Sequence, residues 1–275
     1  MLIDHHTHTS PFSFDGRQSP EELLKAAMHR HLDGVCVTDH YEKDIRYIEG
    51  VEAIFDMDAY AACLKQLKRL GESMGLMVLY GIELGYLPHL SEIFRQRVLR
   101  YPFDVVISSV HILDAEDPYV DDFIYRYGKQ MLYCRYFEQL TEMTRNGPDF
   151  DILGHFDYIC RYAPWQDRKV LWSEHANQLD ELIKSIIDTG RTLEINTATV
   201  AKLRQNGYSV KNSWPDEAIM RRYLEAGGTQ ICLCSDAHEA PFVGRYFAEG
   251  IEWLKSLGFK YLTHYVGRQP VMTPL

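Results

Sequence analysis

The sequence predicts a closed or distorted α/β barrel, and three observations support this fold class. Short apolar runs alternate with longer helical patterns from one end of the 275-residue chain to the other. The apolar runs are continuous, as expected for parallel strands that are covered on both faces. No Pro-, Gly- or Ser-rich linker, internal repeat or low-complexity tract interrupts this pattern. We therefore expect a single domain over residues 1–275, built from seven or eight β–α units.

The predicted strands cover residues 2–4, 34–38, 76–83, 104–110, 150–153, 192–196 and 230–234, with 260–264 as a further candidate. The first helix follows Ser19, which supplies an N-cap, with Pro20 at the first helical position and Glu22 completing a capping box. We expect Gly34 to end this helix. Further helices are predicted at 59–71, 121–145, 173–189, 215–226 and 243–257.

Composition limits the classes of function. Hydrophobic residues make up 46% of the chain and charged residues 25%, as in an ordinary soluble globular protein. The net charge of −10 argues against nucleic acid as a partner, but bound cations could still attract a small anionic substrate. The six cysteines lie mostly in apolar runs, which favours buried free thiols. With no signal-like segment and no apolar stretch of about 18 residues, we expect a cytoplasmic protein with no membrane partner.

Ionisable side chains gather where the predicted strands end. His6 and His8 follow the first strand, and their spacing puts both on one face. Catalytic groups of α/β barrels collect at the C-terminal mouth of the strands, so we expect these side chains to share one pocket. Burying them together is costly unless divalent cations neutralise them, and imidazole with carboxylate suits Zn, Mn or Fe. The other members of the set are Asp39, His40, Glu83, His111, His155, Asp236 and His238.

The motifs at these positions resemble those of the PHP (polymerase and histidinol phosphatase) family, and most closely its histidinol-phosphatase branch. They are DHHTHT at 4–9, VTDH at 37–40, GIE at 81–83, SSVH at 108–111, GHFD at 154–157, EINT at 194–197 and SDAH at 235–238. They occur in the family's order and cover nearly the whole chain. EINT with an Arg-containing loop, followed by SDAH and a long C-terminal helix, favours the histidinol-phosphatase branch. The resemblance implies a distorted (β/α)7 TIM-like barrel of the PHP type.

The resemblance also implies a centre of two or three divalent metal ions, with zinc, manganese and iron as the candidates. Asp15 is the ligand with an alternative interpretation, because the SFDG segment around it also fits a simple turn. Asp39 is expected to orient a neighbouring ligand. The implied ligands are His6, His8, Glu83 and Asp236 for one metal, Glu83 with His111 and His155 for a second, and Asp15, His40 and His238 for a third.

A phosphate monoester also needs a cation outside the metal shell, and arginine can pair with it through two hydrogen bonds. Arg161 after GHFD and Arg245 after SDAH are the best placed, and Arg204 after EINT is a third candidate. A carboxylate such as Asp114, after SSVH, could receive an ammonium group of the substrate. All four residues could equally be ordinary surface charges.

The predicted reaction is hydrolysis of L-histidinol phosphate to L-histidinol and phosphate, by attack of a metal-bridging hydroxide on phosphorus. Asp236 and His238 are the candidate catalytic residues that protonate the leaving alkoxide. A PHP phosphoesterase acting on another small phosphorylated metabolite is the main alternative. A non-catalytic, metal-binding regulatory barrel is a second one, but it would be marked by missing ligands, and none is evidently missing.

Overall fold

The computed structural model describes residues 1–10, 12–45, 52–120 and 122–275. Its main sheet has seven parallel strands in the order β1-β2-β4-β5-β6-β7-β8, and the short strand β3 (His40–Tyr41) pairs with β4. The seven strands are β1 (Ile3–Thr7), β2 (Gly34–Val37), β4 (Met77–Gly85), β5 (Val105–Ser109), β6 (Ile152–Leu153), β7 (Thr192–Asn196) and β8 (Ile231–Cys234).

The first and last strands of this sheet meet just beyond their C-terminal ends. Thr7 and Ala237 form a parallel bridge. The amide of Asp236 donates to the carbonyl of His6 at 2.9 Å, and the amide of His8 donates to the carbonyl of Ala237 at 3.0 Å. These bonds nearly close the sheet into a barrel, so the predicted seven-stranded barrel is confirmed.

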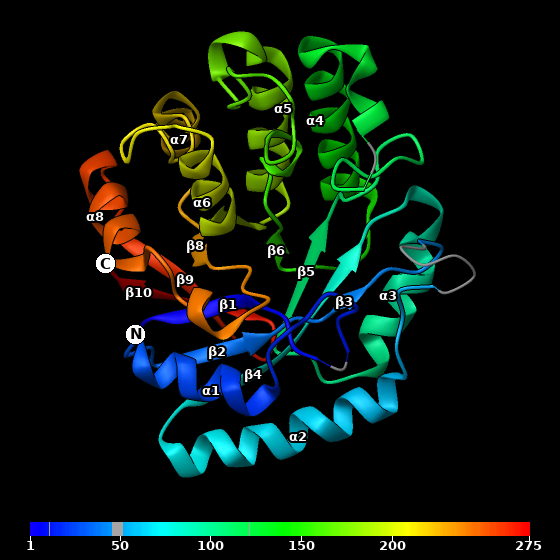
Figure 1. The fold of residues 1–275 in the computed structure, drawn as a ribbon, viewed down its shortest axis with the longest axis vertical. Helices are drawn as coiled ribbons and strands as arrows, with labels where there is room; N and C mark the ends of the chain where they lie inside the picture. The colour runs from blue at the N-terminus through cyan, green and yellow to red at the C-terminus, as the bar shows by residue number, and fades with distance from the viewer. Residues whose placement is uncertain (11, 46–51, 121) are drawn as a thin grey trace.

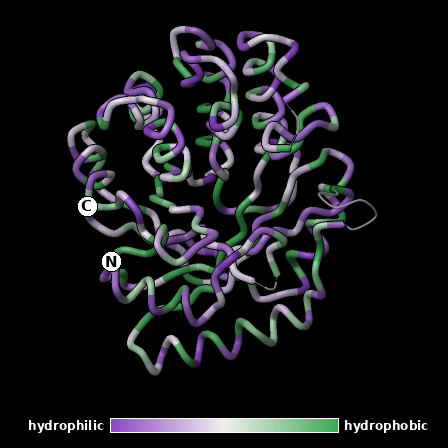
Figure 2. The backbone as a smooth tube through the Cα atoms, in the orientation of Figure 1, coloured by the Kyte–Doolittle hydropathy of each residue, from purple (hydrophilic) through white to green (hydrophobic). Residues whose placement is uncertain are grey.

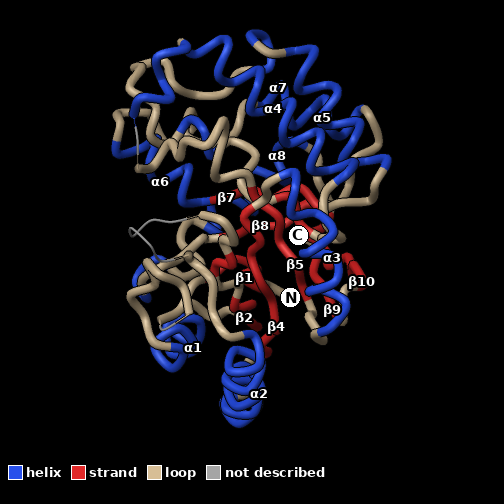
Figure 3. The backbone as a smooth tube through the Cα atoms, turned by 90° about the vertical axis from the view of Figure 1, so that its right-hand side faces the viewer, coloured by secondary structure: helices blue, strands red, loops and turns tan. Residues whose placement is uncertain are grey.

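Helices surround the strands, as Figures 1 and 3 show from two directions. Asp121, the predicted start of one helix, lies outside the described residues. The segment after it is a 3-10 helix (Asp122–Tyr127), and Gly128, with φ 76°, separates this helix from α4. The α-helices are α1 (Pro20–His29), α2 (Met57–Met74), α3 (Ser91–Arg100), α4 (Lys129–Asn146), α5 (Ala176–Asp188), α6 (Thr197–Gln205), α7 (Glu217–Glu225) and α8 (Phe247–Leu257).

The start of α1 confirms the predicted capping box, because Ser19 and Glu22 each accept a hydrogen bond from the other's backbone amide. The predicted end of the helix is wrong. α1 ends at His29, and Gly34 instead begins β2, where a Cβ would lie 2.7 Å from the carbonyl oxygen of Met77. Gly34 is therefore needed for the close approach of two strands and not as a helix stop.

The apolar residues form two layers of core. An inner core fills the barrel with side chains from several strands, among them Ile3, Leu79, Ile107 and Cys234. An outer core lies between the strands and the helices, and the alternation of hydrophilic and hydrophobic residues that produces it is visible along α2 in Figure 2. All six cysteines are free, and four of them, Cys36, Cys160, Cys232 and Cys234, are buried as predicted.

The C-terminal segment forms an antiparallel hairpin of β9 (Tyr261–Val266) and β10 (Gln269–Pro274). The candidate strand at 260–264 is thus not an eighth barrel strand. The hairpin lies across the base of the barrel, where the amide of Arg268 donates to the carbonyl of Asp104 and Thr263 Oγ1 accepts from the amide of Ile231. None of the described helices is long and apolar enough to span a membrane.

Candidate metal centre

The nine predicted metal ligands come together at the C-terminal mouth of the barrel. They come from the ends of five barrel strands, from β3 and from the loop that holds Asp15, and groups of them lie close enough to share a metal ion. His5, between two of these positions, points the other way and stacks on His264 with 5.2 Å between ring centroids. Four such groups are His8, His40 and His238; His6, His8 and Glu83; His6, His155 and Asp236; and His40, Glu83 and His111.

Glu83 lies at the middle of the cluster and is completely buried. Its Oε2 is 3.2 Å from His6 Nε2 and 2.7 Å from His40 Nδ1. Its Oε1 is 3.1 Å from His155 Nε2 and 3.4 Å from His111 Nε2. The two carboxylate oxygens therefore face different sets of histidines, which is the arrangement that a bridging ligand requires.

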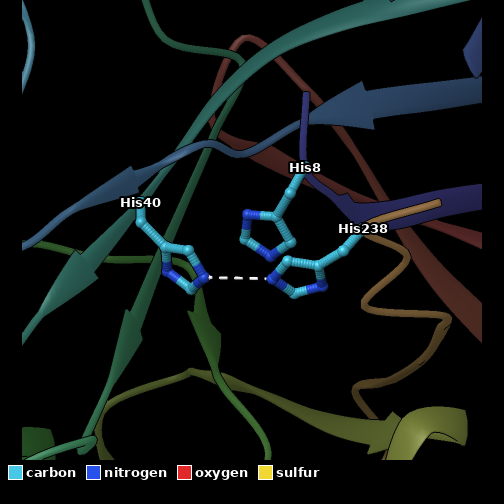
Figure 4. Close-up of side chains that lie close together, drawn as sticks. All are labelled: His8, His40 and His238. Carbon is cyan, nitrogen blue, oxygen red and sulfur yellow. Dashed lines mark hydrogen bonds between the residues drawn. The ribbon is translucent and has the colours of Figure 1, made fainter. Parts of the chain in front are cut away.

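A second part of the cluster contains His8, His40 and His238, whose rings converge in Figure 4. His40 Nε2 is 3.3 Å from His238 Nε2, and the ring of His8 stacks on those of His40 and His238 at 4.1 and 4.2 Å. Asp15 joins this group, because its Oδ2 is 3.0 Å from His238 Nε2. The turn around Asp15 thus brings its carboxylate into the cluster.

Asp236 connects the histidines of β1 with Arg161. Its Oδ1 is 3.2 Å from His8 Nε2, and its Oδ2 accepts a hydrogen bond of 2.8 Å from Arg161 Nη1. Asp236 adopts a positive φ of 52°, a conformation that is uncommon for residues other than glycine and often marks functional sites. Burial opposes ionisation of Asp236, but His6 and Arg161 outweigh it and hold its pKa well below the ordinary range.

Two buried carboxylates that the sequence analysis did not assign orient the predicted ligands. Glu42 Oε1 lies 2.7 Å from His111 Nδ1, and Glu194 Oε1 lies 3.0 Å from His6 Nδ1. Carboxylates in these positions hold the ring proton on Nδ1 and leave Nε2 free for a metal. A sequence signal existed for both, because Glu42 is two residues after His40 and Glu194 opens the EINT motif.

Asp39 acts indirectly, as expected for an orienting residue. It accepts hydrogen bonds from the hydroxyls of Thr9 and Ser13 at 2.8 and 3.0 Å. The hydroxyl of Ser13 also lies 3.1 Å from His8 Nδ1. Asp39 therefore holds the loop after β1 and, through Ser13, the ring of His8.

The donor set fits divalent cations. Glu83 Oε2 lies 3.2 Å from His6 Nε2 and 2.7 Å from His40 Nδ1, yet none of these three buried atoms forms a hydrogen bond of normal geometry among the described residues. Burial alone would lower the pKa of His111, but Glu42 and Glu83 raise it to about 10. The cluster thus calls for positive charge, which protons or metal ions can supply, and a set of imidazoles and carboxylates is typical of Zn, Mn or Fe sites.

Of the four predicted substrate-binding residues, Arg161 lies at the site. It lines the pocket over the cluster, is almost fully buried, and its Nε donates to Thr199 Oγ1 at 2.7 Å. Its Nη2 has no hydrogen-bond partner among the described residues, so one guanidinium nitrogen remains available for a ligand.

The structure does not bring the other three into the pocket. Arg245 packs on the ring of Phe242, and its Nη2 lies 3.5 Å from the carbonyl of Ser235. Arg204 pairs with Glu249 of α8 at 2.9 Å, so it is used in packing one helix against another. Asp114 forms an ion pair with Arg135 of α4.

The pocket over the cluster is lined by aromatic and charged side chains as well as by the histidines. Its floor includes His40, His111, His155 and His238. Its size and position suit a small molecule with one end at the histidines. The other lining residues include Phe14, Arg17, Asp117, Tyr119, Tyr158, Tyr162 and Glu239.

Comparisons with known proteins agree with this geometry. The sequence model of the PHP domain matches residues 4–198. A probable histidinol-phosphatase from Clostridium acetobutylicum is 30% identical over 94% of this chain and 95% of its own length. The histidinol-phosphatase of Lactococcus lactis is 25% identical over 96% of this chain and 94% of its own length.

The fold is also that of a solved structure. The crystal structure of histidinol phosphate phosphatase from Lactococcus lactis, complexed with zinc, L-histidinol and phosphate, has a TM-score of 0.85. The alignment covers 98% of each chain at 23% sequence identity. This likeness confirms the predicted distorted barrel of the PHP type.

Proposed function

The chain belongs to the PHP domain family, and on this premise we propose that it is a metal-dependent histidinol-phosphatase. The proposed reaction is hydrolysis of L-histidinol phosphate to L-histidinol and phosphate. The observation that carries the proposal is the convergence of nine histidines and carboxylates on one buried cluster beside a buried arginine. Relatives that align along nearly their whole length are named histidinol-phosphatases, which supports this substrate.

The proposed ligands fall into three groups that the distances support. The carboxylate of Glu83 would be shared between the first two groups, because its two oxygens face different histidines. Asp15 and His238 lie 3.0 Å apart at the more open side of the cluster. We assign His6, His8, Glu83 and Asp236 to one metal, Glu83, His111 and His155 to a second, and Asp15, His40 and His238 to a third.

Bound divalent cations would supply a hydroxide at neutral pH and neutralise the charge that develops on the phosphoryl oxygens. The chain's own residues orient the substrate. Arg161 is fixed by Asp236 and Thr199, and its remaining Nη2 donors would bind a phosphoryl oxygen at the pocket. Arg204 and Asp114 have no role in the proposed reaction. Arg245 packs next to Ser235 and would only support the backbone there.

The leaving alkoxide needs a proton. The pKa of Asp236 lies well below its ordinary range, because His6 and Arg161 outweigh the effect of burial, so this residue remains a carboxylate. The side chain of His238 is 27% exposed and lines the pocket at the more open side of the cluster. We therefore assign the positioning of Arg161 to Asp236. With His238 bound to the third metal, the proton for the alkoxide would come from solvent at the open side of the pocket.

We further propose a cytoplasmic enzyme that acts on a small phosphorylated metabolite. The net charge of −10 disfavours binding to a nucleic-acid backbone, and the pocket is lined by a few aromatic and charged side chains.

The test is phosphate release by Mn- or Zn-loaded protein from L-histidinol phosphate, from a panel of other phosphomonoesters and from an aryl phosphate. The proposal predicts the highest kcat/KM for L-histidinol phosphate. A higher kcat/KM for another metabolite would replace the substrate and keep the metal-dependent chemistry. No phosphate release from any of these compounds would contradict the proposed function as a whole.

A further inference from the structure

The loop after β5 makes a tight turn that decides which of its carboxylates reaches the pocket. Leu113 and Glu116 exchange two backbone hydrogen bonds of 3.0 Å. The two residues between them, Asp114 and Ala115, have φ values of 54° and 64°, as a type I′ turn requires. Asp114 therefore lies at the tip of the turn, where it pairs with Arg135, and the chain returns toward the pocket at Asp117.

Asp117 is a buried carboxylate, only 6% exposed, with one oxygen engaged. Its Oδ1 accepts hydrogen bonds from the amide of Tyr119 at 2.8 Å and from the hydroxyl of Tyr158 at 3.2 Å. Its Oδ2 has no hydrogen-bond partner among the described residues. Burial raises the pKa of this carboxyl, because it disfavours the charged form. A cation placed beside the carboxylate would stabilise that form.

The other carboxylates that line the pocket already have basic partners. Glu239 pairs with Arg17 at 3.2 Å, Asp236 with Arg161 at 2.8 Å, and Asp15 lies 3.0 Å from His238. Asp117 forms no ion pair with any residue in the described part of the chain. An unpaired carboxylate that is both buried and part of a pocket wall is suited to a ligand cation.

The position of Asp117 relative to the metal centre is set by Tyr158. The ring of Tyr158 lies 5.2 Å from that of His111 and 5.0 Å from that of His155, and its hydroxyl bonds to Asp117. Tyr162 packs on Tyr158 at 5.6 Å, and Tyr119 on Tyr162 at 5.1 Å. A carboxylate and a group of aromatic rings thus stand one side chain away from the histidines, where the alcohol part of a phosphate ester would lie.

We propose that Asp117 is a specificity-determining residue that binds the ammonium group of the substrate's alcohol. The inference rests on the proposed function and gives a physical reason for its preference for the phosphate ester of an amino alcohol, with the tyrosine rings packing against a flat or cationic group. Asp114, the carboxylate that the sequence favoured for this role, is held outside the pocket by the turn.

The experiment replaces the charge of Asp117 and keeps its shape. In Asp117→Asn the amide oxygen still accepts from Tyr119 and Tyr158, so the loop retains its hydrogen bonds. Three substrates are compared: L-histidinol phosphate, imidazolylpropyl phosphate, which lacks the amine, and an aryl phosphate. Asp114→Asn is the matched control, because asparagine also tolerates a positive φ and Asp114 lies outside the pocket.

We expect Asp117→Asn to lower kcat/KM for L-histidinol phosphate by roughly 10- to 100-fold, the size of one lost charge-assisted hydrogen bond. For the two substrates without an amine, kcat/KM changes by less than about threefold, which also shows that the variant is folded. Asp114→Asn leaves all three values unchanged.

An equal loss with all three substrates, or no loss with L-histidinol phosphate, would overturn the role of Asp117. A wild-type enzyme that prefers imidazolylpropyl phosphate to L-histidinol phosphate would also overturn the role of Asp117, but the protein would still be a phosphatase. A metal-loaded wild type that releases phosphate from none of the three contradicts the proposed function itself, and the inference falls with it.

Discussion

The mouth and the base of the barrel both bury ionisable side chains, but they satisfy them differently. At the mouth, Glu83, His6 and His40 leave buried atoms without hydrogen-bond partners among the described residues. At the base, Asp151 Oδ2 accepts from the amide of Val106 at 2.7 Å and from Arg268 Nε at 2.6 Å. The buried carboxylate at the base is thus paired by the chain itself, and the unpartnered rings of His5 and His264 there are kept neutral by burial. The mouth instead gathers several carboxylates and imidazoles that a metal ion can neutralise.

The C-terminal hairpin supplies the groups that pair with Asp151 at the base. The hydroxyl of Tyr265 in β9 lies 2.7 Å from Thr192 Oγ1 and donates to the carbonyl of Asp151 at 3.1 Å. Arg268, in the turn between β9 and β10, reaches Asp151. The difference between the two ends shows how an α/β barrel divides its tasks, with stability at the N-terminal end of the strands and chemistry at the C-terminal end. Four predictions test this division.

The largest effect is expected for Glu83→Gln. This change removes the negative charge of a carboxylate whose two oxygens face different histidines. We expect kcat/KM to fall by about a thousand-fold or more, and bound metal to decrease. Phosphate release and metal content by mass spectrometry measure both effects. Glu225→Gln, an exposed position on α7, serves as the control and should match the wild type. Near-normal activity and metal content in Glu83→Gln would contradict the central role of this carboxylate.

A smaller effect at the mouth is expected for Glu42→Gln. Glu42 fixes the ring of His111 through Nδ1, so its loss should weaken metal binding by about 10- to 100-fold without removing a ligand. A metal titration of activity measures this change. Excess metal should restore most of the wild-type rate, and a loss that excess metal does not restore would argue against an orienting role.

At the base, Arg268→Met should affect stability and leave chemistry intact. It removes the cation beside the buried Asp151 carboxylate, and we expect the free energy of unfolding to drop by about 2 kcal/mol. Denaturant unfolding measures the loss, and kcat/KM should stay within about twofold of the wild type. Arg145→Met, which removes an exposed ion pair, should cost less than about 1 kcal/mol. A large loss of activity in Arg268→Met would break the comparison between the two ends.

The smallest effect concerns the stacked rings of His5 and His264. Burial and the neighbouring His264 lower the pKa of His5 to about 3, and burial lowers the pKa of His264 to about 4. The folded state therefore keeps both rings neutral, while the unfolded state binds protons below its ordinary pKa of about 6.5. Stability is lost as pH falls from about 6.5 toward 4, because the unfolded state binds more protons there.

His264→Phe should reduce this acid sensitivity. Between pH 6.5 and 5.5 the free energy of unfolding of the variant should fall by about 1 kcal/mol less than that of the wild type, the contribution of one histidine. Denaturant unfolding of chelator-treated protein at the two pH values measures the difference without contributions from bound metal. Identical pH dependence in the two proteins would show that the pair does not titrate on unfolding.

The sequence was sufficient for the barrel and for most of the site because both depend on local patterns. Continuous apolar runs predicted the seven barrel strands, and the strand ends carried the proposed ligands. The hairpin partner β10 escaped prediction because its residues are largely exposed and carry no continuous apolar run. α6 escaped because it begins directly after β7, where Asn196 caps it with no intervening loop.

Residues whose role depends on long-range contacts were harder to predict. Glu42 and Glu194 contact histidines that lie 69 and 188 positions away in the chain. Their places beside His40 and in EINT mark them as candidates, but they do not show which histidine each one contacts. Asp114 was predicted for the substrate ammonium because it follows SSVH, but a turn with two positive φ values holds it away from the pocket and returns the chain to the pocket at Asp117. Arg204 was predicted to bind substrate because it follows EINT, but its ion pair with Glu249 of α8 turns its side chain away from the pocket.

The most direct test of the account is a titration of chelator-stripped protein with Mn²⁺ or Zn²⁺, with phosphate release from L-histidinol phosphate measured at each addition. We expect no turnover without metal and a rise that saturates at two or three bound ions per chain. Turnover by the stripped protein, or a rate that does not change as metal is added, would contradict the claim that the mouth of the barrel is a metal centre.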